Sequence, residues 1–181
     1  SGSDYKNYAN LFATPYNGVM GKANAVLRHS GCSSNIIELY ILTKVNNLEL
    51  AKASSQFKYE FTQYMNANKM MTDYLSVLDG EIILVNVSVN VVLDKYYKKF
   101  EDEIKANIIS RVENFFSINN WDYEQNLKDI DVIKALSDMQ QPSRYDIYFT
   151  TNDPDNSGKT VRARYFEIIR PENIAVSFTY E

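Results

Sequence analysis

A regular alternation of residues over one stretch of the chain constrains its fold more than any other feature. From Ile83 to Leu93 every second residue is aliphatic, and the residues between them include asparagine and serine. A period of two is that of a β-strand, because successive side chains point to opposite faces of a sheet. We therefore expect a long strand with one buried face and one face that is partly wet at its centre.

Other stretches carry the helical period. Apolar residues recur every three or four positions over residues 49–66 and again over residues 97–115, which predicts an amphipathic helix in each. A shorter helix is expected over residues 127–139, ending before Pro142, and residues 4–12 are expected to start a short helix. The apolar stripe of the helix over residues 49–66 consists of Leu50, Ala53, Phe57, Phe61 and Tyr64.

Further strands are expected around these helices. Residues 36–42 are rich in β-branched residues, and residues 145–149, 161–169 and 174–180 fit three short strands near the end. Residues 22–28 fit either a strand or the end of a helix. This order of elements predicts an α+β fold, with one or more mixed or largely antiparallel sheets packed by three to four helices.

The length of 181 residues allows one continuous domain or two lobes that share a core. For the two-lobe alternative, we expect a first α+β lobe over residues 4–75 and a second over residues 76–181, which holds the terminal strands. Ser1-Gly2-Ser3 is interpreted as a remnant of cloning, and no initiator methionine is present. We therefore expect the chain to be a piece of a longer protein.

The composition disfavours several classes of partner. Lys and Arg number 19 against 23 Asp and Glu, for a net charge of −4, so no basic surface indicates nucleic-acid binding. No apolar run reaches the roughly 18 residues of a membrane helix. The 14 tyrosines are compatible with an aromatic core, but tyrosine is also enriched at protein interfaces.

One loop carries fragments of two ligand-binding motifs. Gly158-Lys159-Thr160 matches the end of a phosphate-binding loop, but Asp153 stands where that motif requires a glycine. Asp153, Asp155 and Ser157 match the opening of a calcium loop, but Arg164 stands where the twelfth position requires glutamate. We interpret residues 151–160 as a solvated loop between strands.

The remaining candidates also fall short of a catalytic or metal site. His29 and Cys32 are the only histidine and cysteine, so a zinc site has too few ligands. The acidic residues of one stretch suit helix starts better than acid–base catalysis; they are Asp122, Glu124, Asp129 and Asp131. Asn86-Val87-Ser88 matches a glycosylation triplet but lies within the expected long strand. The sequence predicts no enzyme, no catalytic residue, no cofactor and no metal.

The order of several segments resembles one known family. Asp4-Tyr5, Ala9, Gly18-Val19 and Val26-Leu27 are similar to the opening "D-Y-x-x-x-A … G-V … A-x-V-L" of the baseplate J-like family, and residues 69–73 (Lys-Met-Met-Thr-Asp) are similar to its "K-M-L-T-D" junction. Residues 115–121 (Phe-Phe-Ser-Ile-Asn-Asn-Trp) and residues 125–127 (Gln-Asn-Leu) resemble its "F-F-x-I-N-N-(aromatic) … G-Q-x-L" stretch. Glu124 replaces the glycine that usually precedes that glutamine, and the strands after Pro154 have no counterpart.

The resemblance covers residues 4–150 and implies a structural function. The family includes the large baseplate wedge subunit of contractile-tailed bacteriophages, and the chain resembles its carboxy-terminal part. The family resemblance implies self-association as a dimer or ring, contacts with other baseplate wedge subunits, and a place in the virion tail baseplate after assembly in the host cytoplasm. It implies no catalysis.

Two hypotheses follow from the sequence. The first is an assembly module that joins neighbouring wedge subunits into the inner baseplate ring by protein–protein contact. The second is a small nucleotide- or metal-binding enzyme that uses the Asp153–Thr160 loop. Under the first, we expect aromatic side chains to anchor the interface; the candidates are Trp121, Tyr123, Tyr148 and Tyr180.

Overall fold

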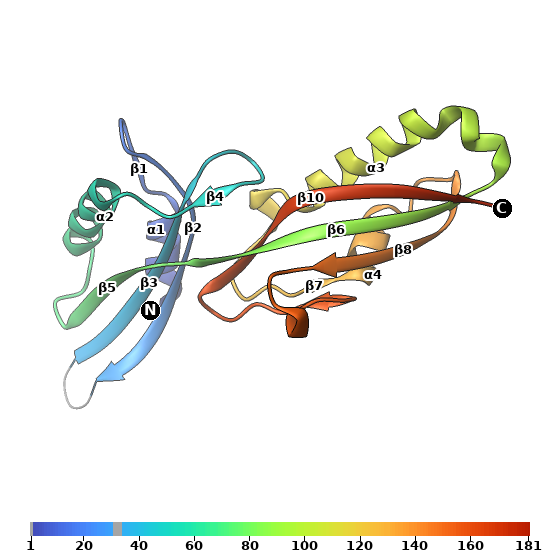
Figure 1. The fold of residues 1–181 in the computed structure, drawn as a ribbon. Helices are drawn as coiled ribbons and strands as arrows, with labels where there is room; N and C mark the ends of the chain where they lie inside the picture. Colours follow the sequence, from blue (N-terminus) through green and yellow to red (C-terminus); the bar gives the residue numbers. More distant parts are fainter. Residues whose placement is uncertain (1, 31–33) are drawn as a thin grey trace. The chain divides into compact units, whose positions relative to one another are not determined.

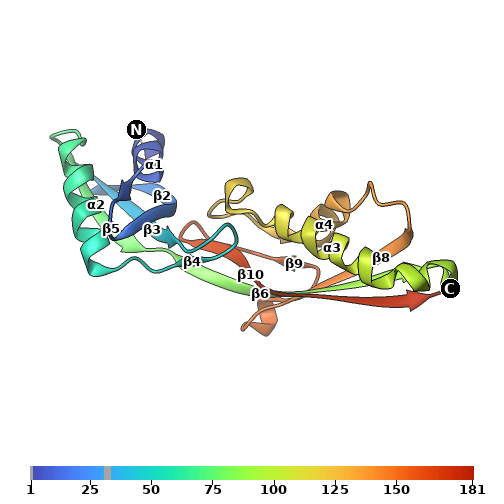
Figure 2. The same ribbon diagram turned by 90° about the horizontal axis from the view of Figure 1, so that it is seen from above.

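The computed structural model describes the backbone of residues 2–30 and 34–181, which forms two compact units (Figures 1 and 2). Unit 1 consists of Ser1–Ile82, Asp122–Glu124 and Arg164–Ile168. Unit 2 consists of Ile83–Trp121, Gln125–Ala163 and Ile169–Glu181. Each unit combines helices with a sheet, which makes the chain an α+β protein.

Unit 1 contains a five-stranded sheet and two helices. The strands are β1 (Ala13–Thr14), β2 (Gly18–Ser30), β3 (Ser34–Lys44), β4 (Leu50–Ala51) and β5 (Asp73–Asp79), and the helices are α1 (Gly2–Asn10) and α2 (Ser55–Ala67). The strands follow the order β1-β2-β3-β4 with antiparallel pairing, and β5 pairs with β3 in parallel. The sheet is therefore mixed, and the stretch over residues 22–28 is a strand.

The core of unit 1 lies between one face of this sheet and the two helices. It combines aliphatic residues of β3 with aromatic residues of α2 and of the α1–β1 connection. Phe12 lies at the centre of the aromatic group, with ring centroids 5.3 Å from both Phe57 and Phe61 in edge-to-face geometry. These pairs fix α2 against the end of α1.

Helix α2 begins later than the sequence predicts. Leu50 belongs to β4, and Ala53 precedes the helix. The helix begins after Ser54, whose hydroxyl oxygen accepts a hydrogen bond of 3.1 Å from the backbone N–H of Phe57. Phe57 and Phe61 are buried as expected, but the next fully buried residue is Met65, because Tyr64 lies at the edge of the core.

Unit 2 is organised around a three-stranded sheet in the order β10-β6-β8. Its elements are β6 (Glu81–Leu93), α3 (Glu101–Phe115), β7 (Leu127–Lys128), α4 (Asp129–Ala135), β8 (Pro142–Thr150), β9 (Thr160–Val161) and β10 (Glu167–Tyr180), with 3-10 turns at Lys95–Phe100, Ile118–Asn120 and Pro154–Asn156. Strands β6 and β10 begin in unit 1. Strands β7 and β9 pair with each other, α3 contacts α4, and α4 contacts β8.

The two strongest sequence predictions are confirmed here. Strand β6 covers the whole alternating stretch, and its residues from Val85 to Val91 on one face are at most 1% exposed. Helix α3 buries Ile104, Ile108 and Val112. Its expected first turn is the 3-10 segment over residues 95–100, whose Phe100 is 40% exposed.

The last third of the chain differs from prediction. The strand expected over residues 161–169 is broken, because Arg164 and Glu167 form a turn in which the Glu167 N–H donates to the Arg164 carbonyl at 2.9 Å. The final strand is longer than expected and begins at Glu167. Helix α4 spans only Asp129–Ala135, because Leu127 and Lys128 pair with β9 instead of entering the helix.

The division between the units also differs from the expected lobes of residues 4–75 and 76–181. The first boundary lies between Ile82 and Ile83, inside β6. Residues 76–79 belong to unit 1 because β5 pairs with β3 as far as Asp79. Two short later segments, 122–124 and 164–168, return to unit 1, which sequence patterning did not predict.

Candidate functional site

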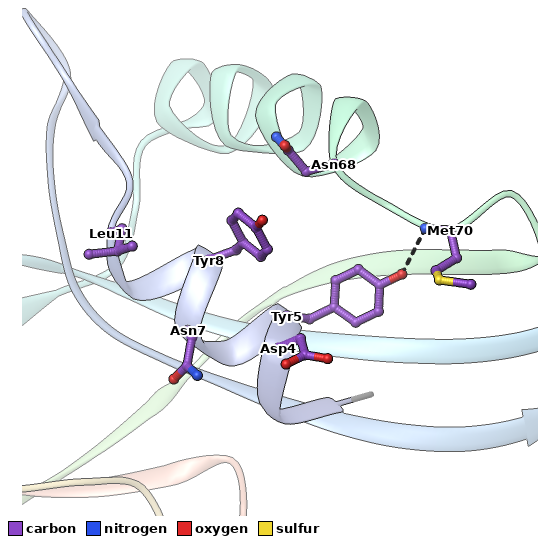
Figure 3. A pocket seen from close by; sticks show the side chains of 7 residues that line it. All are labelled: Asp4, Tyr5, Asn7, Tyr8, Leu11, Asn68 and Met70. Carbon is purple, nitrogen blue, oxygen red and sulfur yellow. Dashed lines mark hydrogen bonds between the residues drawn. The ribbon is translucent and has the colours of Figure 1, made fainter.

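An apolar groove lies in unit 1 between α1 and the segment that links α2 to β5. Its volume is about 640 Å³, and its apolar lining includes Tyr5, Tyr8, Leu11 and Met70. Figure 3 shows the ring of Tyr5 pointing from α1 toward Met70 of this linking segment and the ring of Tyr8 turned toward α2. The polar residues of the lining are Asp4, Asn7 and Asn68.

Tyr5 fixes the floor of the groove. Its side chain is 4% exposed, and its hydroxyl donates a hydrogen bond of 2.6 Å to a carboxylate oxygen of Asp73. The same hydroxyl accepts the backbone N–H of Met70 at 2.9 Å, drawn as a dashed line in Figure 3. Lys69 supports the segment by donating from Nζ to the Asp73 carbonyl at 2.9 Å. The groove is therefore built into the fold.

The rim of the groove consists of exposed apolar side chains. Leu11 is 79% exposed, Met70 is 65% exposed and Tyr8 is 46% exposed, and the neighbouring Met71 is 98% exposed. The helical period explains the division, since Tyr5 and Ala9 share the face of α1 that enters the core, and Phe12 follows them just after the helix. Sequence analysis missed Tyr8 and Leu11, although their place off that buried stripe was a detectable signal.

The phenol of Tyr5 is a titratable group at the floor of the groove. Burial raises the pKa of Tyr5 above its ordinary value, and the hydrogen bond to Asp73 adds to this effect. The phenol therefore stays protonated at neutral pH and acts as a structural donor. A contiguous set of exposed apolar side chains is typical of a surface that another molecule covers.

Two of the four predicted interface aromatics are buried instead. Trp121 is 3% exposed, with its ring 5.2 Å from both Phe115 and Phe116 and beneath the guanidinium of Arg170 at 5.8 Å. Tyr123 is 5% exposed. The prediction that these two residues are exposed anchors is wrong, because both rings are buried within the chain.

The hydroxyl of Tyr123 donates to the Lys22 carbonyl at 3.1 Å. Its ring lies so close to Gly80 that a Cβ there would come within 2.4 Å of the phenol oxygen. Gly80 is thus the link between β5 and β6, where glycine is needed for close approach. Burial raises the pKa of Tyr123 strongly, and the charges of Asp122 and Asp79 raise it further.

The other two predicted aromatics remain accessible. Tyr148 on β8 is 50% exposed. Tyr180, at the end of β10, is partly exposed, and its hydroxyl donates to a carboxylate oxygen of Glu101. Both lie in unit 2, so neither belongs to the groove around Tyr5.

The Asp153–Thr160 loop uses its polar groups internally. The Asp153 carboxylate accepts the N–H of Asp155 at 2.9 Å, and the Asp153 carbonyl accepts the Ser157 hydroxyl at 2.9 Å. Lys159 donates from Nζ to the Ile147 carbonyl at 2.6 Å and pairs with Asp146. The loop continues into β9 and not into the helix that a phosphate-binding loop requires.

The remaining candidate residues have structural positions. Asp122 pairs with Lys6 at 2.8 Å, and Asp129 accepts the N–H of Ile130 at 2.8 Å. Asn86, in the middle of β6, accepts a hydrogen bond from Asn173. Cys32 and the side chain of His29 lie outside the described residues.

Two kinds of site have no support in the part of the chain that the structure describes. Histidine, cysteine, aspartate and glutamate side chains form no cluster of three or more that could hold a metal ion there. None of the helices described is both long enough and apolar enough to cross a membrane.

Comparison with known proteins adds no assignment. No family model matches the chain, and no curated protein matches its sequence. The function must therefore be argued from the groove, the exposed surfaces and the order of the sequence segments.

Proposed function

We propose that the chain is a structural assembly module of a contractile phage tail, which joins neighbouring baseplate wedge subunits into the inner ring by protein–protein contact. The apolar groove of unit 1 carries this proposal. It offers a preformed hollow with exposed apolar side chains on its rim, and burial of such a surface drives association.

The position of two sequence segments supports the proposal. Asp4-Tyr5…Ala9 and residues 69–73 are two of the stretches that resemble the baseplate J-like pattern, and they lie far apart in the sequence. The hydrogen bonds from Tyr5 to Asp73 and from Met70 to Tyr5 join them at the groove. Both segments of the resemblance therefore contribute to the same surface.

A second observation concerns the turn where the sequence departs from the family pattern. Glu124 stands in place of the expected glycine, and its φ of 63° lies in the left-handed region. Glycine adopts that region at little cost. The backbone of the chain thus keeps a conformation that suits the residue of the family pattern.

The test is binding to the other wedge subunits of the same phage, produced separately and mixed with this chain. A double variant, Leu11→Asp with Met70→Asp, is expected to lower the affinity at least tenfold, because each carboxylate would be desolvated in the contact. Val45→Asp with Tyr59→Asp is the matched control, since both residues are in unit 1, exposed and apolar.

Binding that is equal for the wild type and the groove variant would contradict the assignment of the groove. A wild-type chain that binds no wedge subunit would contradict the proposed function itself. Circular dichroism on each variant would show that the exposed substitutions leave the fold intact.

A further inference from the structure

A hollow of about 330 Å³ lies beside the start of α3, within unit 2. One part of its lining is aromatic and another part is polar. The aromatic residues are Tyr96, Tyr97 and Phe100, and the polar residues are Glu103, Asn107 and Gln141. This hollow therefore differs in place and in chemistry from the groove of unit 1.

The spacing of the lining residues explains why they lie together. Tyr96, Phe100 and Glu103 follow one another at intervals of four and three residues along the 3-10 segment and α3, and such intervals place side chains on one face of a helix. Gln141 comes from the chain just before β8. Tyr96 is 63% exposed and Phe100 is 40% exposed, so both rings are open to a ligand.

The aromatic rings already attract a cation of the chain itself. The ammonium nitrogen of Lys99 lies 4.5 Å from the centre of the Tyr96 ring and 5.3 Å from the centre of the Phe100 ring. Both distances are those of a cation–π interaction. The Lys99 side chain is exposed, and a lysine ammonium is strongly hydrated. A cation that is less strongly hydrated can therefore replace it on these rings.

Hydrogen-bond acceptors lie beside the rings. Among the residues that the structure describes, no lysine or arginine nitrogen lies within ion-pair distance of the Glu103 carboxylate. Asn107 follows on the same helix, and its side-chain oxygen accepts a hydrogen bond of 2.9 Å from Nε of Arg111. An amide oxygen has a second lone pair. The hollow thus combines aromatic rings with acceptors for the N–H groups of a cation.

We propose that this hollow binds the guanidinium group of an arginine side chain from another polypeptide. A guanidinium is planar and weakly hydrated, so it stacks on aromatic rings, and its N–H groups donate to a carboxylate at the same time. A quaternary ammonium fits less well because it has no N–H group for Glu103. The inference goes beyond the proposed function, since this site lies in unit 2 and does not use the groove of unit 1.

The experiment is a titration of the isotope-labelled full chain with a blocked peptide that contains one arginine, followed by the NMR shifts of the backbone amides. The shifts should saturate and should concentrate on residues 95–107 and on Gln141. The matched ligand control is the same peptide with citrulline in place of arginine, which keeps the shape and removes the charge. It should bind about tenfold more weakly, because both the cation–π contact and the ion pair are lost.

Two variants test the residues of the hollow. Tyr96→Leu and Glu103→Gln should each lower the affinity for the arginine peptide about threefold, the size expected for one exposed cation–π contact or one exposed ion pair. Tyr59→Leu replaces a tyrosine of α2 that is 61% exposed, and Asp102→Asn replaces an exposed carboxylate outside the lining. These two matched controls should bind like the wild type.

A third variant tests the displacement of the internal cation. Lys99→Met removes the competing ammonium and keeps an apolar stem, so the affinity for the arginine peptide should rise about threefold. Lys105→Met makes the same change in charge at another exposed position of α3 and should have a smaller effect. An equal rise in both variants would overturn the displacement, because it would show a general effect of net charge.

Several other outcomes would overturn the proposal. Equal binding of the arginine and citrulline peptides would show that the charge is not recognised, and shifts confined to other parts of the chain would show that the hollow is not the site. Choline that binds as tightly as the arginine peptide would indicate an unselective cation site. Free arginine that binds more tightly than the blocked peptide would contradict a polypeptide ligand. None of these results involves the groove variant, so the proposed function is tested separately.

Discussion

The two units differ in the kind of surface that each offers to a partner. Unit 1 presents an apolar groove whose floor is locked by the Tyr5–Asp73 hydrogen bond. Unit 2 presents the segment over residues 95–103, where charged residues surround the exposed rings of Tyr96 and Phe100. An apolar surface gains affinity from burial, whereas a patterned charged surface mainly sets orientation. The contrast suggests that one chain can make two contacts of different character.

The cores of the two units differ in a similar way. Unit 1 packs aromatic rings between its helices and its mixed sheet. Unit 2 packs aliphatic residues of α3 and β6, with Trp121 held at the edge of Phe115 and Phe116. The aromatic core of unit 1 depends on the contact of segments far apart in the chain, so truncation there should be costly.

The largest expected loss of stability is that of Phe61→Ala in unit 1, which is compared with Ile108→Ala in unit 2. Phe61 is fully buried against Phe12 and Phe57, and Ile108 is fully buried on α3. Loss of the Phe61 ring should lower the free energy of unfolding by about 3–5 kcal/mol, and loss of the Ile108 side chain by about 2–5 kcal/mol. Urea denaturation of both variants tests the order. A smaller cost at Phe61 would mean that the unit 1 core collapses around the missing ring.

The second prediction is loss of stability at high pH, with the larger contribution from unit 1. Burial raises the pKa of Tyr5, Tyr40 and Tyr123 in unit 1, and it raises the pKa of Tyr145 in unit 2 to about 12. An unfolded tyrosine ionises near pH 10. The stabilisation is therefore complete below about pH 10 and is lost as the pH rises toward the folded-state values.

Tyr123→Phe provides the control for this effect. At neutral pH the variant should lose about 1 kcal/mol with the hydrogen bond to Lys22. Its urea midpoint should then fall less between about pH 9 and about pH 11 than that of the wild type. A parallel decline in both proteins would show that Tyr123 is not the group responsible.

The smallest expected effect is at Glu124. Its φ of 63° is strained for a residue with a Cβ, and its side chain is exposed. Glu124→Gly should raise the free energy of unfolding by about 0.5–1 kcal/mol, since release of strain exceeds the added entropy of the unfolded chain. Thermal denaturation measures the change, with Glu172→Gly on the exposed part of β10 as a destabilising control. A lower melting temperature for Glu124→Gly would show that the turn gains nothing from glycine.

Sequence patterning predicted the helices and strands that have a regular spacing of apolar residues within their own stretch of chain. Strand β6 covers its expected stretch, and helix α3 covers its own after the first turn, because a period of two or of 3.6 residues records which face of an element is buried. The two-residue strands β4, β7 and β9 carry no such period. The pairing of β4 with β3 moved the start of α2, and the pairing of β7 with the distant strand β9 moved the start of α4.

The candidate site was less predictable than the fold. The exposed rim of the groove has a weak helical signal at Tyr8 and Leu11, but nothing local indicates that Tyr5 meets Asp73. The sequence also did not predict the burial of Trp121 and Tyr123, since aromatic residues are common both in cores and at interfaces. Tertiary packing alone distinguishes these two uses.

The sequence by itself determined the α+β class, the long strand β6 and the amphipathic helix α3, because these features follow from the spacing of neighbouring side chains. The tertiary structure decided the parallel pairing of β3 with β5, the union of α1 with residues 69–73 at the groove, and the left-handed turn at Glu124. These depend on which distant segments exclude water together, and that is a property of the packed chain as a whole.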